Sequence, residues 1–319
     1  MNITSGSSLR LPQSELTFGL LMMFLSVVLS PVIDIFSKLA AITIPPAEVT
    51  AGRFIFQSLF ALPAMAMRGQ WGVWTWRRSG VHAIRAAVLT LSMVSFVTTL
   101  QVMEVADAIA IFFVEPMMLT ILSSIFLKET IGWRRYTACA VGFLGAMLII
   151  QPSFQEVGFV ALLPVVTALC IAVYVMITRV VSHSEDAWSM QFQTGIWGIG
   201  FSLILLAIGR ATGSTILDPA VPDLTAMLYL LGVGASAAIA GILTVHAYRA
   251  APASTLAPLQ YFEIVSATIF GWLVFDNFPD AIKWLGILII IGSGLYILWR
   301  ERRFASKPVS DTSETAFTP

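Results

Sequence analysis

The sequence places a carboxylate and a proline side by side in the middle of an apolar run. Residues 112–118 read FFVEPMM and lie within the mostly apolar stretch 106–127. An ionisable residue at that depth costs roughly 2.5–3.5 kcal/mol to insert into a membrane, which makes it a candidate functional residue. Glu115 is too short to reach either surface, so it is protonated, paired or exposed in a wet cavity. Pro116 removes a backbone hydrogen bond and is expected to kink its helix.

A second carboxylate occupies a similar position late in the chain. Glu263 lies in the run APLQYFEIV, about one turn after Pro258 and close to Gln260 and Tyr261. If both carboxylates lie at mid-depth, they are expected to line one shared cavity. The alternative is that each carboxylate pairs separately with a neighbouring helix.

Three more charged residues fall within or at the ends of apolar segments. Asp34 and Lys38 are four residues apart and therefore share one helix face. They form either an ion pair, with Lys38 reaching the surface, or a charged wall of a translocation path. Arg53 has Gln57 one turn farther along its face. We expect Arg53 to hold a carboxylate, phosphate or planar carbonyl edge with two hydrogen bonds, although it could also extend to the nearer surface.

The composition is that of a membrane protein. Of 319 residues, 57% are hydrophobic and only 11% are charged, and the mean hydropathy is +0.86; soluble domains carry about 25% charged residues. The net charge of zero gives no reason to expect a nucleic-acid partner. The sequence shows no phosphate-binding loop, zinc-protease motif or nucleophile elbow, and its cysteines and histidines lack metal-ligand spacing. We therefore do not expect an enzyme.

Hydropathy predicts an all-α integral membrane protein with ten transmembrane helices. A bilayer-crossing helix needs about 20 mostly apolar residues. The candidate segments are 16–38, 46–67, 84–103, 106–127, 134–151, 157–178, 188–209, 224–248, 253–275 and 281–299. The ends, 1–15 and 300–319, are polar or basic, and the last residues are expected to be disordered.

The basic residues predict the orientation. With the N-terminus in the cytoplasm, 14 of the 18 Lys and Arg residues fall in cytoplasmic segments. Among these is Arg85, counted with the loop before the third span. Only Arg210 and Lys283 fall outside, and Lys38 and Arg53 belong to spans. This asymmetry places both termini in the cytoplasm.

The two halves of the chain correspond. Shifting 106–150 onto 253–297 aligns Glu129 with Asp276, Gly145 with Gly292, and Pro116 with Glu263. Five spans in each half mean that the second half enters the membrane from the opposite side. The sequence therefore predicts two inverted five-helix repeats, 16–151 and 152–299, an architecture of secondary transporters with a site near the midplane.

Three stretches carry a resemblance to a known superfamily. They are DIFSKLAAITIPPAEVTAGRF (34–54), the run from EVADAIAIFFVEP to LIIQP (104–152), and the run from AYRAAPAST to GLYIL (247–298). Together they resemble the drug/metabolite transporter superfamily in its EamA-type ten-span form. Lys128 stands where the family usually has glycine. The pattern D-x-x-x-K followed by P-x-E-x-x-x-x-R is most similar to the branch that holds riboflavin and S-adenosylmethionine uptake carriers.

The resemblance implies a carrier for a small solute in a bacterial inner membrane, without cofactor or ATP hydrolysis. Riboflavin is the first substrate it suggests, followed by S-adenosylmethionine or an amino acid, and export is the alternative to uptake. Asp34, Lys38, Arg53, Gln57, Glu115, Pro116, Gln260, Tyr261 and Glu263 are the expected path residues. Titration of Glu115 or Glu263 would couple transport to protons. A channel or a membrane scaffold is the alternative class, and the sequence does not indicate an oligomeric state.

Overall fold

The computed structural model describes residues 13–68, 76–126, 133–182, 187–214, 216–250, 256, 259, 260, 262–276 and 278–305. Among these residues there are helices and connections but no strand. The elements are α1 (Gln13–Ala40), α2 (Pro46–Arg68), α3 (Trp76–Leu100), α4 (Val105–Phe112), α5 (Glu115–Phe126), α6 (Trp133–Val157), the 3-10 turn η1 (Gly158–Leu162), α7 (Leu163–Ser182), α8 (Ala187–Thr212), α9 (Leu224–Ala250), α11 (Phe262–Phe275) and α12 (Ala281–Ala305).

Helices lie within each of the ten segments predicted from hydropathy. Five helical stretches of the described chain are each long and apolar enough to cross a bilayer: Ser14–Ala40, Ser79–Leu100, Ser153–Thr178, Trp188–Thr212 and Leu224–Thr244. The predicted third span, 84–103, is shifted in the structure, because α3 begins about two turns earlier. The predicted fourth span, 106–127, is two helices, since the chain breaks after α4 and restarts at Glu115.

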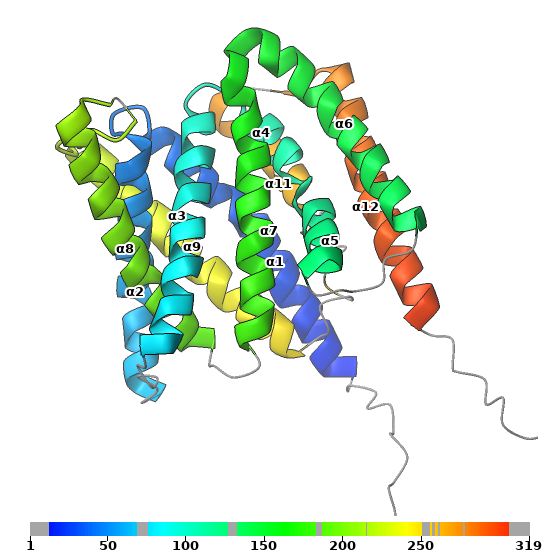
Figure 1. Cartoon of the computed structure of the whole chain (residues 1–319), viewed down its shortest axis with the longest axis horizontal. Helices are drawn as coiled ribbons and strands as arrows, with labels where there is room; N and C mark the ends of the chain where they lie inside the picture. Colours follow the sequence, from blue (N-terminus) through cyan, green and yellow to red (C-terminus); the bar gives the residue numbers. More distant parts are fainter. Residues whose placement is uncertain are drawn as a thin grey trace, which may run out of the picture.

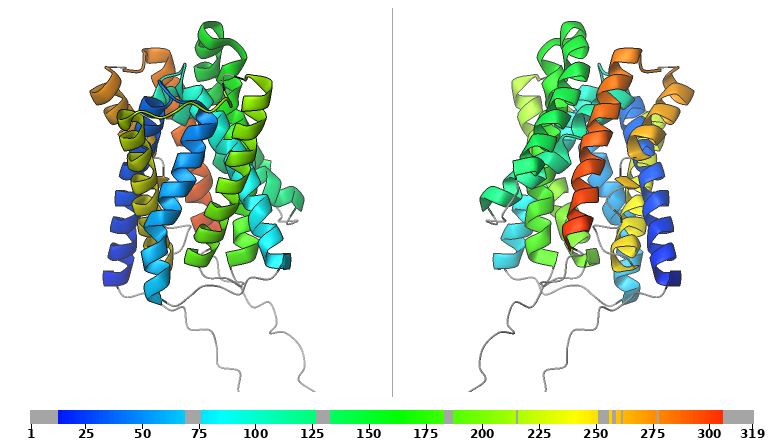
Figure 2. Two further views of the ribbon diagram at one scale, coloured as in Figure 1. Left: turned by 90° about the vertical axis from the view of Figure 1, so that its left-hand side faces the viewer. Right: turned by 90° about the vertical axis from the view of Figure 1, so that its right-hand side faces the viewer.

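Most of the helices form a closed ring. Around it α1 contacts α9, α9 contacts α2, α2 contacts α8, and α8 contacts α3. The circuit continues from α3 to α7, from α7 to α5 and α4, from α4 to α11, and from α11 back to α1. Helices α6 and α12 pair with each other beside this ring, at the right of Figure 1, and the long helices stand roughly upright in both views of Figure 2.

The contacts keep their pattern when corresponding helices of the two halves are exchanged. The contact of α1 with α9 becomes that of α7 with α3, and the contact of α2 with α9 becomes that of α8 with α3. The contact of α1 with α11 becomes that of α7 with α5, while the pairs α2–α8 and α6–α12 each map onto themselves. The same order of helices therefore builds both sides of the ring.

Close packing brings α6 and α12 together and encloses α4. A methyl group built at Gly286 would lie 2.7 Å from the carbonyl oxygen of Gly145, so the two backbones approach without side chains between them. In α4 every residue from Val105 to Ile111 is buried. This short helix belongs to an apolar core with Ile149 of α6, Ile264 of α11 and Ile290 of α12.

Candidate functional site

Ionisable side chains from three ring helices come within electrostatic range of one another. Asp34 of α1 is buried, and the charges of both Glu263 on α11 and Arg53 on α2 act on it. Ser30, one turn before Asp34, donates a hydrogen bond of 2.6 Å from its Oγ to Oε1 of Glu263. The sequence analysis named each of these residues as a candidate but did not group them; we call the three together the central cluster (Asp34, Arg53 and Glu263).

Arg53 also contacts the other side of the ring. Its Nη1 donates to the sulfur of Met93 on α3, and Tyr174 of α7 is near enough to influence its charge. Among the residues that the structure describes, its Nε is buried without a hydrogen-bond partner. A buried donor left unsatisfied is costly, so one hydrogen-bonding group of this guanidinium is not used by the described residues.

Both carboxylates that the sequence analysis expected at mid-depth, Glu115 and Glu263, lie at the start of a helix. Glu115 is the first residue of α5 and Glu263 the second residue of α11. The shift of 147 residues that aligns the halves also aligns the first residues of these helices, 115 and 262. The amino end of a helix carries a partial positive charge that stabilises a carboxylate. Glu115 is half-buried and has contacts of its own.

The sequence analysis expected Pro116 to kink a continuous helix. In the structure Pro116 lies instead in the first turn of a separate helix, α5. The turn at Phe113 and Val114 separates α4 from α5, and Pro116 is the second residue of α5. Proline is tolerated in the first turn because the backbone N–H groups there have no partner within the helix. The structure therefore has two short helices, separated by a turn, where the sequence predicted one kinked span.

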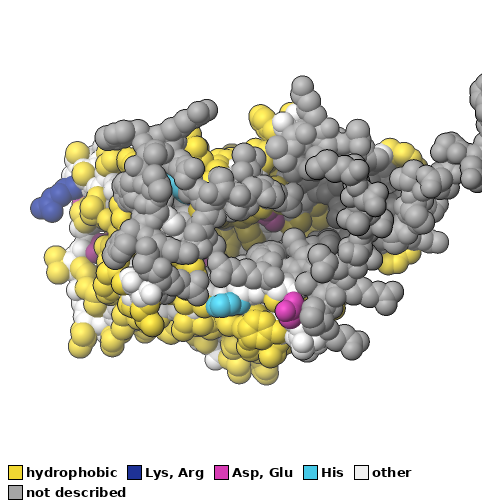
Figure 3. Space-filling view, turned by 90° about the horizontal axis from the view of Figure 1, so that it is seen from below, with side chains coloured by type: hydrophobic (Ala, Val, Ile, Leu, Met, Phe, Trp, Pro, Cys, Tyr) yellow, Lys and Arg dark blue, Asp and Glu magenta, His cyan; other side chains and the backbone are white. Residues whose placement is uncertain are grey.

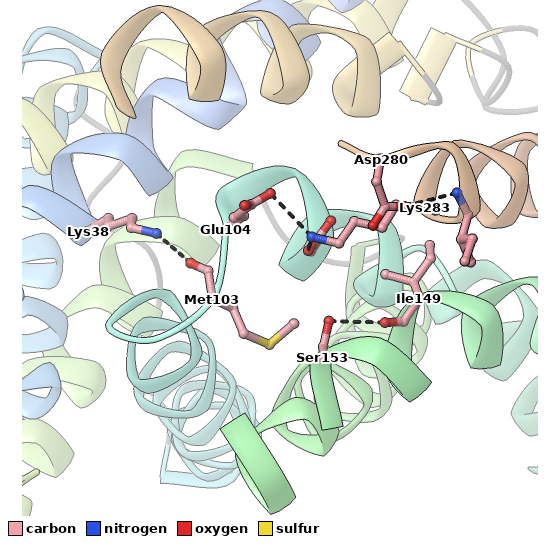
Figure 4. A network of polar contacts seen from close by, with 9 residues as sticks. Lys38, Met103, Glu104, Ile149, Ser153, Asp280 and Lys283 are labelled. Carbon is pink, nitrogen blue, oxygen red and sulfur yellow. Dashed lines mark hydrogen bonds and ion pairs between the residues drawn. The ribbon is translucent and has the colours of Figure 1, made fainter. Parts of the chain in front are cut away.

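Lys38 does not pair with Asp34. It donates to the carbonyl oxygen of Met103, in the connection before α4, as Figure 4 shows. Its ammonium also lies 5.0 Å from the ring centroid of Phe275, at the end of α11. Within the described chain no ion pair joins Asp34 to Lys38, so the interpretation of these two as an ion pair is wrong for this structure.

A second ion network lies at the upper end of the molecule in Figure 1. Lys283 of α12 places its Nζ 2.7 Å from Oδ2 of Asp107 and 3.5 Å from Oε2 of Glu104. The Lys283 and Asp107 side chains are 10% and 3% exposed, so this pair is largely desolvated. Asp280 accepts hydrogen bonds from the backbone of Ile282 and Lys283 and thereby begins α12 (Figure 4).

Sequence reasoning missed this upper network (Glu104, Asp107 and Lys283). It placed Lys283 in a loop outside the membrane and did not consider Asp107. The available signal was the acidic residue in the otherwise apolar run ADAIAIFF. The structure shows that the basic residue of one half compensates an acidic residue of the other.

Arg85 is also misplaced by the sequence-based interpretation. It was counted with a cytoplasmic loop, but it lies within α3 and is 1% exposed. It contacts His82 Nδ1, Thr178 Oγ1 and the hydroxyl of Tyr174, each at 3.1 Å. The guanidinium also lies 4.8 Å from the ring centroid of Tyr174. Arg85 thus ties α3 to α7, and Tyr174 links it to the surroundings of Arg53.

Gln57 lines a small pocket one turn beyond Arg53. The pocket lies between α2, α8 and α9, and its walls include Ala61, Trp188, Gln191, Ala237 and Gly241. Gln260 is half-buried beside α11, whereas Tyr261 and Pro258 lie outside the described residues. Seen from below, an acidic side chain is visible within a hollow of the described surface, which is otherwise mainly hydrophobic (Figure 3).

The arrangement can orient polar groups of a solute. It offers carboxylates, a guanidinium and carboxamides inside a ring of apolar helices. No group of three His, Cys, Asp or Glu residues within the described chain is arranged to hold a metal ion.

Comparisons with known proteins agree with this arrangement. The model of the EamA-like transporter family matches residues 17–151 and 158–299. The S-adenosylmethionine uptake transporter of Rickettsia bellii is 30% identical over 295 residues, which make up 92% of this chain and 97% of that protein. The riboflavin transporter of Rhizobium johnstonii is 29% identical over 314 residues, 95% of this chain and 98% of the relative.

A solved structure shares the fold. The match to this solved crystal structure covers 91% of the present chain and 99% of the other protein's chain. The TM-score is 0.64 and the sequence identity is 16%. Together with the family match, which spans most of the sequence, these similarities confirm the resemblance drawn from the motifs. The chain belongs to the EamA-like transporter family and is a multi-pass membrane transporter rather than an enzyme.

Proposed function

We propose that the chain is a secondary transporter that moves a small polar or planar metabolite across a bacterial inner membrane by alternating access. In this proposal ten transmembrane segments form two inverted five-helix repeats, 16–151 and 152–299, with both termini in the cytoplasm. Support comes from the helix contacts that are retained when the halves are exchanged and from the family match to each half. With Arg85 assigned to α3, the other 13 of those 14 basic residues still lie on one side of the predicted topology and add to it.

The central cluster is the observation that carries this proposal. Ionisable side chains are expensive inside a membrane and are typically found on substrate or ion pathways. Here Asp34, Arg53 and Glu263 come from three different helices of the ring, and a fourth helix supplies Met93 against Arg53. A site built from several helices changes shape when those helices move, which is the requirement for alternating access.

Riboflavin uptake is the first candidate activity. Carboxylates accept and guanidinium groups donate hydrogen bonds, so the central cluster suits the hydroxyl groups of a polyol tail. The relative named riboflavin transporter aligns with 95% of the chain. S-adenosylmethionine is the second candidate, because its carboxylate and ammonium groups would complement Arg53 and the two acids. The relative with that name is 30% identical.

Uptake into proteoliposomes tests the proposal and separates the two candidates. We expect saturable uptake of labelled riboflavin or S-adenosylmethionine, accelerated by unlabelled solute on the opposite side, as a carrier requires and a channel or scaffold does not. Arg53→Ala and Glu115→Gln should abolish uptake while the protein still inserts. Arg210→Ala is the matched control, because Arg210 is exposed at the end of α8. Normal uptake by both site variants would contradict the proposal.

Coupling to protons has its own test in the same vesicles. If Glu115 or Glu263 carries a proton during the cycle, an inward pH gradient should drive accumulation and a protonophore should collapse it. Glu263→Gln would then retain exchange of labelled for unlabelled solute but lose accumulation. If the amount of accumulated solute were the same with and without the pH gradient, transport would not be coupled to protons.

A further inference from the structure

The upper network joins the two halves of the chain. Glu104 and Asp107 belong to the first half and Lys283 to the second, so their ion pairs hold the start of α4 against the first turn of α12. Lys38 at the end of α1 adds a contact beside them, because its ammonium donates to the carbonyl oxygen of Met103 (Figure 4). These contacts persist only while both halves keep their relative positions.

The same contacts close the upper end of the ring above the central cluster. Met103 and Asp107 are buried, as is every residue of α4 from Val105 to Ile111. Helix α1 runs toward the upper end in Figure 1, and Lys38 lies one turn beyond Asp34 on the same face. A solute that reached the central cluster from the upper end would therefore have to separate these contacts.

The upper network has no charged counterpart in the other repeat. The shift of 147 residues that aligns the halves pairs its members with uncharged residues: Glu104 with Ala251, Asp107 with Ser254, and Lys283 with Tyr136. In an inverted repeat, these counterparts belong to the opposite end of the ring. The ion pairs therefore stabilise closure of one end without an equivalent in the mirror-image state.

A buried ion pair suits a contact that has to open. It adds little to stability, because the desolvation of both charges offsets much of their attraction. Oδ1 of Asp107 is also buried without a hydrogen-bond partner among the described residues. Water can solvate Asp107 and Lys283 when the halves separate, whereas separated apolar side chains would be exposed at a cost. The pair can therefore break and re-form in each transport cycle.

We propose that the upper network and Lys38 form the outer gate of the carrier, and that their charges bias the empty protein toward the state closed to the outside. The inference rests on the proposed function, because it takes the upper end as the outer end from the predicted orientation. It deepens that function by naming the contacts that must break when a solute enters from outside.

Labelling of one introduced cysteine in intact cells tests the gate. Ser37→Cys, with the native cysteines replaced by alanine, places a thiol between the levels of Asp34 and Lys38, where Ser37 is 3% exposed. Asp107→Asn combined with Lys283→Met should raise the rate of its labelling by a membrane-impermeant maleimide about tenfold, a shift of about 1.4 kcal/mol toward the outward-open state. Because the double substitution removes both charges of the pair, neither is left buried without its partner.

Three further variants separate opening of the gate from general loss of structure. Lys283→Arg keeps the charge and should leave the labelling of Ser37→Cys nearly unchanged. Ile42→Cys, at a residue that is 74% exposed, should be labelled equally with and without the double substitution. Arg85→Met removes a buried charge from the α3–α7 contact and should not raise labelling at residue 37. Unchanged labelling in the double variant, or an equal rise in Arg85→Met, would overturn the inference.

This labelling does not depend on the transported solute. If proteoliposomes take up neither riboflavin nor S-adenosylmethionine, the substrate proposal fails, whereas the labelling still decides whether the network holds the upper end closed. The same reagent applied to inside-out vesicles reports the orientation. If the double variant gained labelling at residue 37 only from the cytoplasmic side, the upper end would face the cytoplasm and the assignment of an outer gate would be wrong.

Discussion

Two helix contacts occupy equivalent places in the ring but are held together by different forces. Where α1 meets α9, Val233, Ala237 and Ala240 pack against Ile33, and Ser26 hydrogen-bonds across to Thr244 at 2.7 Å. Where α3 meets α7, the buried guanidinium of Arg85 contacts Tyr174 and Thr178. The first contact depends on small residues and close packing, and the second on a charge with directed hydrogen bonds.

The difference shows that a repeated architecture does not require repeated chemistry. Exchange of the halves preserves the contacts of α1 with α9, α2 with α9 and α1 with α11, yet it does not preserve what lies between the helices. Small side chains allow helices to approach closely in a membrane, whereas a buried guanidinium requires specific partners. Substitutions in the two contacts should therefore have effects of different size and different origin.

Removing the charge from the α3–α7 contact should have the largest effect. Arg85→Met leaves the Tyr174 and Thr178 hydroxyls without their donor in a buried site, and we expect the free energy of unfolding to fall by about 3 kcal/mol. Equilibrium unfolding in mixed detergent micelles measures this. Arg210→Met, at an exposed arginine, should change the same quantity by less than about 0.5 kcal/mol. If Arg85→Met and Arg210→Met lowered the free energy of unfolding equally, the buried charge would not be what holds α3 to α7.

Overpacking the α1–α9 contact should have an intermediate effect. A methyl group at Gly232 would lie 2.9 Å from the Phe36 ring, so Gly232→Ala should cost about 2 kcal/mol of unfolding free energy. Adding Phe36→Leu should restore part of that loss. Gly80→Ala on α3 serves as the control, because a methyl group there meets nothing within 4 Å. A stable Gly232→Ala protein would mean that Phe36 moves aside, and the contact would then be loosely packed.

Deleting the polar link in the same contact should have the smallest effect. Ser26→Ala removes the hydrogen bonds to Thr244 and to the carbonyl oxygen of Ala240, and we expect a loss of about 1 kcal/mol in the unfolding measurement. Because the two hydroxyls act together, Thr244→Val should add little once Ser26 has been replaced. A loss as large as that of Arg85→Met would show that hydrogen bonding, and not packing, holds α1 to α9.

The sequence located the long helices well because a membrane-spanning helix needs about 20 apolar residues, and five described helices meet that requirement. It also located the break near Pro116, since proline cannot continue a helix without losing a hydrogen bond. Asp34, Arg53 and Glu263 were each recognisable as candidates because charges are rare in apolar runs, but their grouping was not predicted. These features depend on local composition and can be read from a single segment.

The remaining features depend on helix boundaries and on contacts between distant segments. Arg85 was assigned to a loop because the predicted span began at 84, whereas the helix begins at Trp76 and carries it inside. The pairing of Lys283 with Asp107 follows from the position of α12 beside α4, which no local pattern specifies. Lys38 bonds to Met103 and not to Asp34 for the same reason. Spacing along one helix could not reveal these partners.

The upper network also has a consequence for biosynthesis. Helix α4 is about 12 Å long and α5 about 18 Å, whereas the hydrocarbon core measures about 30 Å, so neither enters the bilayer alone. Glu104 and its partner Lys283 are separated by 179 residues, which a ribosome needs roughly 10–35 s to translate. During that interval Glu104 and Asp107 are present without Lys283, the residue that compensates their charge. A chain cut short before α12 should therefore be recognised and degraded as incomplete, although all of its first repeat has already been made.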